Sequence, residues 1–305
     1  MSVTLFGALG ASKELIIFHA GSLSVPIKAM VDAFKNENPG VTVYLEAAGS
    51  RECARKITDL KKPCDVMASA DYSVITTLLI PDYADWNIKF AGNEMAIVYT
   101  PKSKRAGEIT RDNWFEILKD KDILFGRADP NSDPCGYRAV LTIKLAEKYY
   151  NKPGLTDILL KKNTEYIRPK ETDLLAFLET NAIDFIFLYR SVALQHDLKY
   201  LILPDEINLK KAEFAQFYKS VSVDLTGKEP GATITQVGEP MIYGVTIPRS
   251  APNTELAKKF IIFMLSKEKG MAIMEREGQP SLVPASEETF NKIPAELKQF
   301  ALPRK

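Results

Sequence analysis

The stretch FGRADPNSDPCGYRAV, residues 125–140, carries two carboxylates four residues apart, Asp129 and Asp133, and each is followed by proline. Pro134 suits the first position of a helix, where its missing N–H costs no hydrogen bond. Asp133 would then be the N-cap residue, whose side chain accepts a bond from an unpaired N–H of the first turn. Gly136 lets another group approach the backbone closely. Two interpretations stay open: Asp133 only caps a helix, or it also offers an oxygen to a ligand.

A further carboxylate, Glu171, lies in RPKETD at residues 168–173, at the start of the apolar-periodic run ETDLLAFLET. An acid in the first turn of a helix is favourable by itself, because it complements the helix dipole. Asp133 and Glu171 could instead form a general acid/base pair, or Cys135 could be a nucleophile, and the chain would then be an enzyme. Neither of the two histidines sits in a recognisable catalytic motif. We therefore do not expect an enzyme.

Gly-Ser occurs twice, at residues 21–22 and 49–50, each time after an apolar run that predicts a buried strand. Ser22 and Ser50 could simply cap the helices that follow. Their recurrence after consecutive strands favours a shared role, since free N–H groups and the dipole at a helix start attract an anion. Neutral donors could thus hold a dianion. Two carboxylates nearby would repel it, unless they meet a positive centre within it.

The elements that must position these residues alternate between apolar runs and helical periodicity, which predicts parallel α/β layers. Ligands of such sheets bind at the carboxyl ends of strands, beside helix N-termini. GNEMAIVYT and PMIYGVTIP are similar runs placed where the chain could cross between two lobes and return. We therefore expect lobe one to comprise residues 1–92 and 242–305, and lobe two residues 93–241. The polar, turn-rich residues 205–238 predict a loop or hairpin.

Composition excludes several classes of protein. Forty basic and thirty-nine acidic residues give a net charge of +1, which is no electrostatic footprint for nucleic acid or an anionic membrane. No apolar stretch is long enough to span a membrane, and no P-loop signature is present. Cys53 and Cys64 could pair outside the cytosol, or be small core residues. The first residues, MSVTLFGALGASKE, lack the basic region of a signal peptide and a lipid-anchor cysteine.

Five motifs taken together, HAGSL, AAGSR, DPCGYRA, RPKETDLL and YRSVALQH, resemble archaeal molybdate/tungstate-binding proteins, the solute receptors of ABC transporters. The resemblance implies a type II periplasmic-binding-protein fold, with two α/β lobes closing on one oxyanion. It implies hydroxyl and backbone donors to the oxo groups at Ser22, Ser50, Cys135, Glu171 and Tyr189. It also implies that the carboxylates of Asp133 and Glu171 coordinate the molybdenum or tungsten, making a six-coordinate site.

The resemblance further implies an ABC transporter permease as partner, an extracytoplasmic and cell-surface-associated location, a monomer, and no cofactor besides the ligand. A receptor for sulfate or phosphate is the nearest alternative, but those anions offer no open metal coordination to two carboxylates. A transcriptional effector domain of the same fold would need a DNA-binding segment, and no basic helix-turn-helix-like stretch is evident. Residue types alone do not separate molybdate from tungstate.

Overall fold

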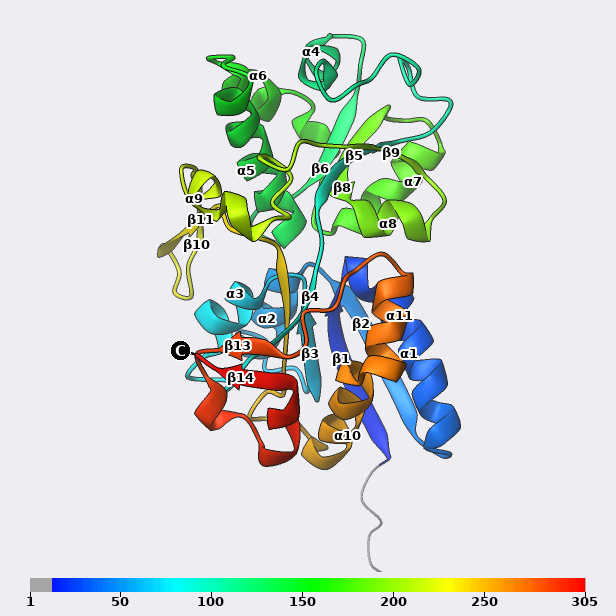
Figure 1. Ribbon diagram of the computed structural model, residues 1–305, viewed down its shortest axis with the longest axis vertical. Helices are drawn as coiled ribbons and strands as arrows, with labels where there is room; N and C mark the ends of the chain where they lie inside the picture. Colours follow the sequence, from blue (N-terminus) through cyan, green and yellow to red (C-terminus); the bar gives the residue numbers. More distant parts are fainter. Residues whose placement is uncertain (1–12, 305) are drawn as a thin grey trace, which may run out of the picture.

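The computed structural model describes residues 13–304 of the chain, which form two α/β bodies stacked end to end (Figure 1). We call them lobe one and lobe two. Lobe one is built on a five-stranded sheet, in the order β2 (Thr42–Ala48), β1 (Glu14–Ala20), β3 (Val66–Ser69), β12 (Ile242–Thr246) and β4 (Ile88–Gly92). Lobe two is built on a second, in the order β7 (Ile167–Arg168), β6 (Phe125–Ala128), β8 (Phe185–Tyr189), β5 (Met95–Tyr99) and β9 (Lys199–Ile202).

Helices cover both sheets. Those around the first sheet are α1 (Ser24–Glu37), α2 (Ser50–Thr58), α3 (Tyr72–Val74), α10 (Thr254–Leu265) and α11 (Ala272–Arg276). Those around the second are α4 (Trp114–Lys119), α5 (Pro134–Tyr149), α6 (Leu155–Lys161), α7 (Leu174–Glu179), α8 (Arg190–Gln195) and α9 (Ala215–Tyr218). The apolar stripe of α1 is buried, and its Phe34 packs edge-on against Phe260 of α10 with ring centroids 5.3 Å apart. Such burial of one helix face is what the helical periodicity predicts.

Two smaller strand pairs complete the fold. The hairpin of β10 (Ser222–Thr226) and β11 (Thr233–Val237) is antiparallel and confirms part of the predicted loop or hairpin region, residues 205–238, which also contains the short helix α9. The pair β13 (Ala285–Glu287) and β14 (Ala301–Pro303) is parallel and lies near the C-terminus, beside lobe one (Figure 1).

The expected parallel α/β layers are present, but each five-stranded sheet also contains antiparallel strands. β1 runs parallel to β2 and β3, and β6 runs parallel to β7 and β8, but β12 is antiparallel to β3 and β4. β5 is likewise antiparallel to β8 and β9. A strand–helix–strand unit returns the chain to the same end of its sheet, so its strands are parallel. A strand that arrives from the other lobe has no crossover helix before it and can therefore run antiparallel to its neighbours. The lobe boundaries at 92 and 242 stay a prediction, and residues 1–12 of the first segment lie outside the described residues.

Cys53 and Cys64 are free thiols in this structure, buried in one apolar cluster with Phe18 and Met67. Burial raises the pKa of Cys53 to about 12, so this thiol stays protonated at neutral pH. Both residues therefore act as small core side chains.

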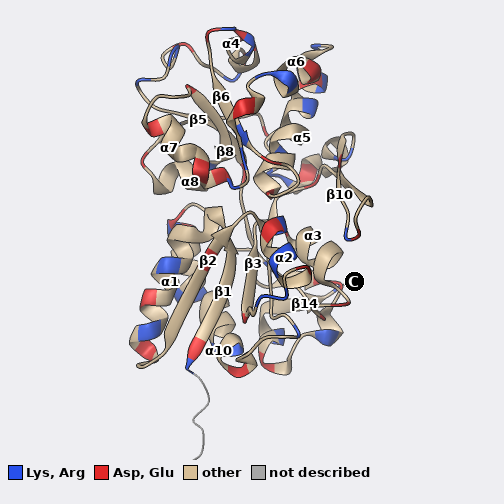
Figure 2. Ribbon diagram, turned by 180° about the vertical axis from the view of Figure 1, so that it is seen from behind, with Lys and Arg blue, Asp and Glu red and all other residues tan. Residues whose placement is uncertain are grey.

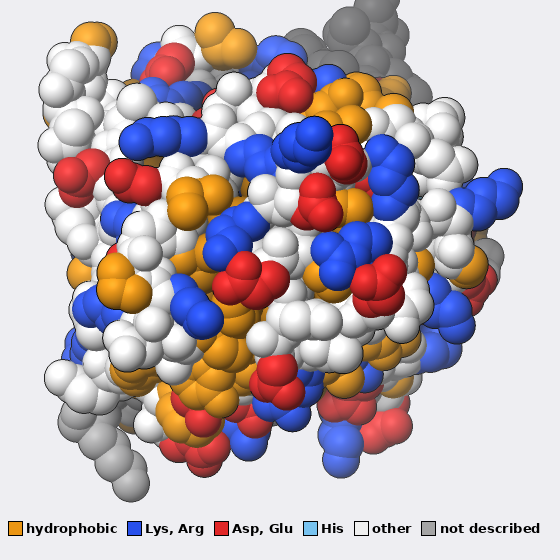
Figure 3. Space-filling model, turned by 90° about the horizontal axis from the view of Figure 1, so that it is seen from above, with side chains coloured by type: hydrophobic (Ala, Val, Ile, Leu, Met, Phe, Trp, Pro, Cys, Tyr) orange, Lys and Arg blue, Asp and Glu red, His pale blue; other side chains and the backbone are white. Residues whose placement is uncertain are grey.

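Basic and acidic positions are interspersed over both lobes (Figure 2), and the face seen from above is also mixed in sign (Figure 3). This distribution agrees with the net charge of +1. Across residues 13–304, no helix is long and apolar enough to cross a membrane.

Candidate functional site between the lobes

Asp133 caps α5, as its spacing predicts: its Oδ1 accepts a bond from the Cys135 N–H at 2.7 Å. Its Oδ2 accepts a second bond, from the Glu171 N–H at 3.0 Å, so one carboxylate holds the starts of two helical segments together. Asp129 has a different role, because its carboxylate accepts bonds from the Asn131 N–H and the Ser132 hydroxyl within the preceding turn. Of the two acids in the stretch, only Asp133 bonds to Glu171.

Gly136 serves the turn rather than a ligand. A Cβ at this position would lie 2.6 Å from the backbone oxygen of Asp129. The close approach expected at this glycine is therefore made by the chain itself.

Glu171 begins a 3₁₀ turn (Glu171–Asp173) before α7, and its carboxylate is buried against lobe one. Its Oε1 accepts the Ser22 N–H at 2.5 Å, a bond between the two lobes. Its Oε2 is buried and has no hydrogen-bond partner. A Cβ at residue 21 would lie 2.6 Å from this Oε2, so the glycine of the first Gly-Ser pair makes room for the carboxylate. A buried, unpartnered carboxylate oxygen is costly and calls for a positive partner.

The two carboxylates are electrostatically unfavourable as they stand. Burial raises the pKa of Asp133, and burial together with the adjacent Asp133 carboxylate raises the pKa of Glu171 well above its usual range. The Arg138 guanidinium opposes the shift at Asp133. Such a pair is stabilised either by a shared proton or by a cationic centre placed between its oxygens.

Ser50 and Tyr189 each accept a bond from an internal donor. The Ser50 hydroxyl accepts the Ala70 N–H at 2.9 Å, and the Tyr189 hydroxyl accepts from Nη1 of Arg138 at 3.0 Å. A hydroxyl has one hydrogen to donate, and an N–H cannot accept it. The hydrogens of both hydroxyls are therefore left for another acceptor.

Ser22 is held in a similar way. Its hydroxyl lies 2.9 Å from the Tyr243 hydroxyl, which also accepts from Nδ2 of Asn93 at 2.8 Å. Either hydroxyl can donate in this pair, and when Tyr243 donates, the hydrogen of Ser22 is left for another acceptor. The hydroxyls of Ser50 and Tyr189, and that of Ser22 when Tyr243 donates to it, each have a hydrogen to offer to an anionic partner.

The Cys135 amide differs from expectation. We expected it to be free for an oxo group, but the cap bond to Asp133 Oδ1 engages it. The Cys135 thiol is buried against the carbonyl of Phe187, at 3.7 Å, and burial raises its pKa well above the usual value. A thiol that stays protonated is a poor nucleophile, which argues against the catalytic reading of Cys135.

The sequence did not predict the contacts of Arg138 and Asp71 beside the site. Arg138 is buried and reaches from lobe two to the Ala70 carbonyl and to Asp71 in lobe one. The surroundings of the site therefore include a charged guanidinium as well as neutral donors. Tyr137 and Arg138 belong to the DPCGYRA motif, so their proximity to Asp133 was a usable signal, but nothing local marks Asp71 or Tyr243.

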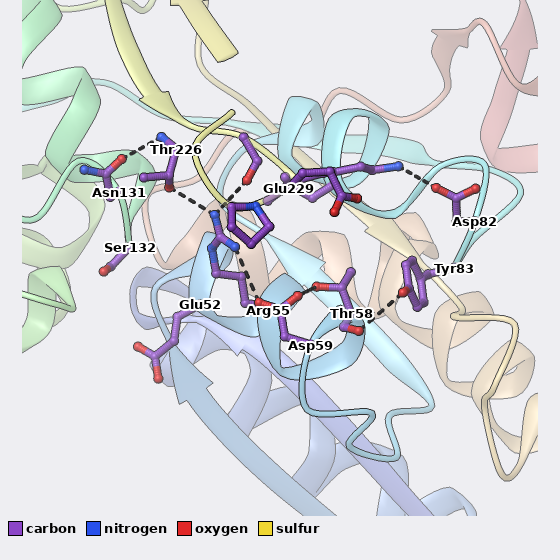
Figure 4. A pocket seen from close by; sticks show the side chains of 15 residues that line it. Glu52, Arg55, Thr58, Asp59, Asp82, Tyr83, Asn131, Ser132, Thr226 and Glu229 are labelled. Atoms are coloured by element: carbon purple, nitrogen blue, oxygen red, sulfur yellow. Dashed lines mark hydrogen bonds and ion pairs between the residues drawn. The ribbon is translucent and has the colours of Figure 1, made fainter. Parts of the chain in front are cut away.

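The larger cavities of the described chain lie beside this contact, not in it. One, of about 770 Å³, is lined by α2, residues 78–83 and the tip of the β10–β11 hairpin (Figure 4). Its two basic side chains nearest the hairpin already have partners: Arg55 bonds to the Thr226 hydroxyl at 3.0 Å, and Lys228 pairs with Asp82 at 2.8 Å. Residues 13–304 hold no group of three or more His, Cys, Asp and Glu side chains that could bind a metal ion. The buried contact between the lobes is therefore the candidate site.

Two α/β lobes joined over a buried polar contact define the fold of the periplasmic solute-binding proteins. The profile of the bacterial extracellular solute-binding proteins matches residues 15–278, and the chain belongs to this family. An uncharacterized solute-binding protein of Petrotoga mobilis is 50% identical, over 98% of this chain and 94% of its own. The molybdate/tungstate-binding protein WtpA of Pyrococcus abyssi is 44% identical, over 93% of this chain and 89% of its own. The periplasmic molybdate-binding protein of Azotobacter vinelandii shares the fold, with a TM-score of 0.64 at 16% identity, over 88% of this chain and 99% of that one.

Proposed function

We propose that this protein is an extracytoplasmic receptor that binds molybdate or tungstate and delivers it to the permease of an ABC transporter. Family membership and the 44% identity to a molybdate/tungstate-binding protein support the proposal. The observation that carries it is the buried pair of Asp133 and Glu171, in which Oε2 of Glu171 has no partner. A ligand with a positive metal centre and negative oxygens satisfies both the carboxylates and the hydroxyls around them.

The donors divide by charge. The hydroxyls of Ser22, Ser50 and Tyr189 would donate to oxo groups, with Tyr243 donating to the Ser22 oxygen. Asp133 and Glu171 would each give one oxygen to the metal, because hard oxygen ligands suit a high-valent metal centre. Four oxo oxygens and two carboxylate oxygens make a six-coordinate site.

The backbone amides of Cys135 and Glu171 have a more limited role in this proposal. Both donate to the carboxylate of Asp133, at 2.7 and 3.0 Å. They would reach an oxo group only by sharing their hydrogens between Asp133 and the ligand. We therefore assign the main share of oxo recognition to the three hydroxyls.

Selectivity follows from the same carboxylates. Sulfate and phosphate have the tetrahedral shape but offer no coordination position to Asp133 and Glu171, so they would meet only repulsion. The proposed activity is binding and not catalysis, with the oxyanion as cargo and without a cofactor. That the protein acts as a monomer and without nucleic acid stays a prediction.

Isothermal titration calorimetry with molybdate, tungstate, sulfate and phosphate tests the proposal. Saturable heat with molybdate or tungstate, and none with the other two anions, is the expected result. Saturable heat with sulfate or phosphate alone would favour the alternative receptor and leave the two carboxylates as local helix-start residues.

A further inference from the structure

A buried group of three side chains joins the lobes directly behind the candidate site; we call it the clamp. Asp71 belongs to lobe one, where its Oδ1 caps α3 by accepting the Ser73 N–H at 2.8 Å. Its Oδ2 receives two bonds from α5 of lobe two: the Tyr137 hydroxyl donates at 2.5 Å, and Nη2 of Arg138 lies at 3.0 Å. One carboxylate of lobe one thus holds two consecutive residues of lobe two.

The clamp is inaccessible to water in this arrangement. Asp71 and Tyr137 are each 1% exposed, and Arg138 is 2% exposed. Buried ions depend on each other, because removing one partner leaves an uncompensated charge in a medium that solvates it poorly. The Asp71–Arg138 pair is therefore well satisfied only while the lobes are together.

Arg138 also contacts groups next to the predicted ligand donors. Its Nη1 donates to the Ala70 carbonyl at 2.7 Å and to the Tyr189 hydroxyl at 3.0 Å. The N–H of the same Ala70 is the donor to the Ser50 hydroxyl. A guanidinium has five donors and no acceptor, so the Tyr189 oxygen must accept and its hydrogen must turn away from Arg138. One side chain therefore connects lobe closure to the orientation of a site hydroxyl.

We infer that Asp71, Tyr137 and Arg138 form a cross-lobe clamp that sets how long the oxyanion is retained, with Arg138 as the positioning residue for Tyr189. The inference rests on the proposed function, because it assigns these residues to the same binding event. The clamp touches no part of the ligand. It stabilises the arrangement in which Ser22 and Ser50 of lobe one and Tyr189 of lobe two face the oxyanion together.

Tyr137→Phe is the most direct test, since it removes one bond to Asp71 and keeps the ring. Tyr218→Phe is the matched control: Tyr218 is a buried tyrosine of lobe two whose hydroxyl bonds to the backbone at Asp205, within its own lobe. Tungstate dissociation is measured by stopped-flow fluorescence after rapid mixing with a chelating competitor, and ligand-free melting is measured alongside. We expect Tyr137→Phe to raise the dissociation rate about tenfold or more, and Tyr218→Phe to leave it unchanged.

A double-mutant cycle separates a clamp from two independent losses. Tyr137→Phe removes the donor of this bond and Asp71→Ala removes its acceptor, so the double variant should dissociate little faster than the faster single variant. Arg138→Lys keeps the charge but loses the planar guanidinium fork, and its effect on dissociation should shrink when Tyr189 is already phenylalanine. Independent multiplication of the effects in both cycles would contradict the inference.

The outcomes distinguish the two proposals. Binding by the parent protein, with an unchanged dissociation rate in Tyr137→Phe, would overturn the clamp and leave the receptor function standing. Absence of binding heat with molybdate and tungstate in the parent protein would overturn the receptor function, and the clamp with it. A melting temperature that falls equally in Tyr137→Phe and Tyr218→Phe, without a difference in dissociation, would reduce Tyr137 to a packing residue.

Discussion

Replacing Glu171 by glutamine should change ligand affinity and ligand-free stability in opposite directions. The substitution keeps the size of the side chain, and its amide oxygen can still accept the Ser22 N–H that Oε1 accepts in the parent protein. It removes the negative charge that burial and Asp133 disfavour, and it removes the oxygen that we assign to the metal.

The magnitudes follow from the burial of the carboxylate. A lost bond to a charged group costs about 1.5–3 kcal/mol, so affinity for molybdate or tungstate should fall by roughly 10- to 150-fold. Without ligand, the unpartnered Oε2 and the neighbouring Asp133 charge destabilise the parent protein. An unsatisfied buried polar group costs about 1–3 kcal/mol, so the ligand-free variant should be more stable by a similar amount.

The direction in which ligand-free stability changes with pH is also determined. The pKa of Glu171 is raised in the folded protein, so this group favours folding at low pH and loses that contribution as pH rises through the folded-state pKa. The stability gain of Glu171→Gln should therefore grow with pH. Melting curves without ligand and calorimetry with tungstate measure both effects. Glu165→Gln, at an exposed position nearby, is the control for loss of one negative charge. Unchanged tungstate affinity in Glu171→Gln would refute the assignment of Glu171 to the metal.

Three further predictions concern the hydroxyls, the lobes and the half-buried acid Glu239. Ser22→Ala and Ser50→Ala should each weaken tungstate binding at least several-fold in calorimetry, and unchanged affinity in both would reduce them to structural hydroxyls. Small-angle scattering should give a smaller radius of gyration with tungstate than without it, because a ligand held by both lobes favours the closed state. Identical radii would mean that the site lies within one lobe or that the ligand-free protein is already closed. Burial raises the pKa of Glu239 to about 7, so its contribution to stability is lost as pH rises toward that value. Glu239→Gln should therefore reduce the loss of melting temperature between about pH 5 and about pH 8, and an unaltered pH profile would contradict this reasoning.

Local patterns predicted the parts of the site that depend on local geometry. The cap at Asp133, the first-turn position of Glu171 and the hairpin region all follow from residue types within a few positions of each other, and the structure has them. The cysteines also follow the ordinary rule that lone thiols are small core residues.

Contacts between distant segments could not be predicted. The Ser22 and Tyr243 hydroxyls are 221 positions apart in the chain, and Arg138 and Asp71 come from different lobes. No periodicity marks such pairs, since each side chain is a plausible core or surface residue in its own segment. The antiparallel entry of β5 and β12 was missed for a related reason: alternation of strands and helices describes βαβ units, but not a strand that arrives from another lobe.

The coordination of the bound metal tests the central claim most directly. X-ray absorption at the tungsten edge, on the tungstate complex of the parent protein, should show six oxygen neighbours: four oxo groups and one oxygen each from Asp133 and Glu171. Asp133→Asn and Glu171→Gln should each lower the coordination number and the affinity, because a ligating carboxylate must be ionised. A four-coordinate tungsten in the parent protein, with unchanged affinity in both variants, would show that these two acids serve only the helix starts where they stand.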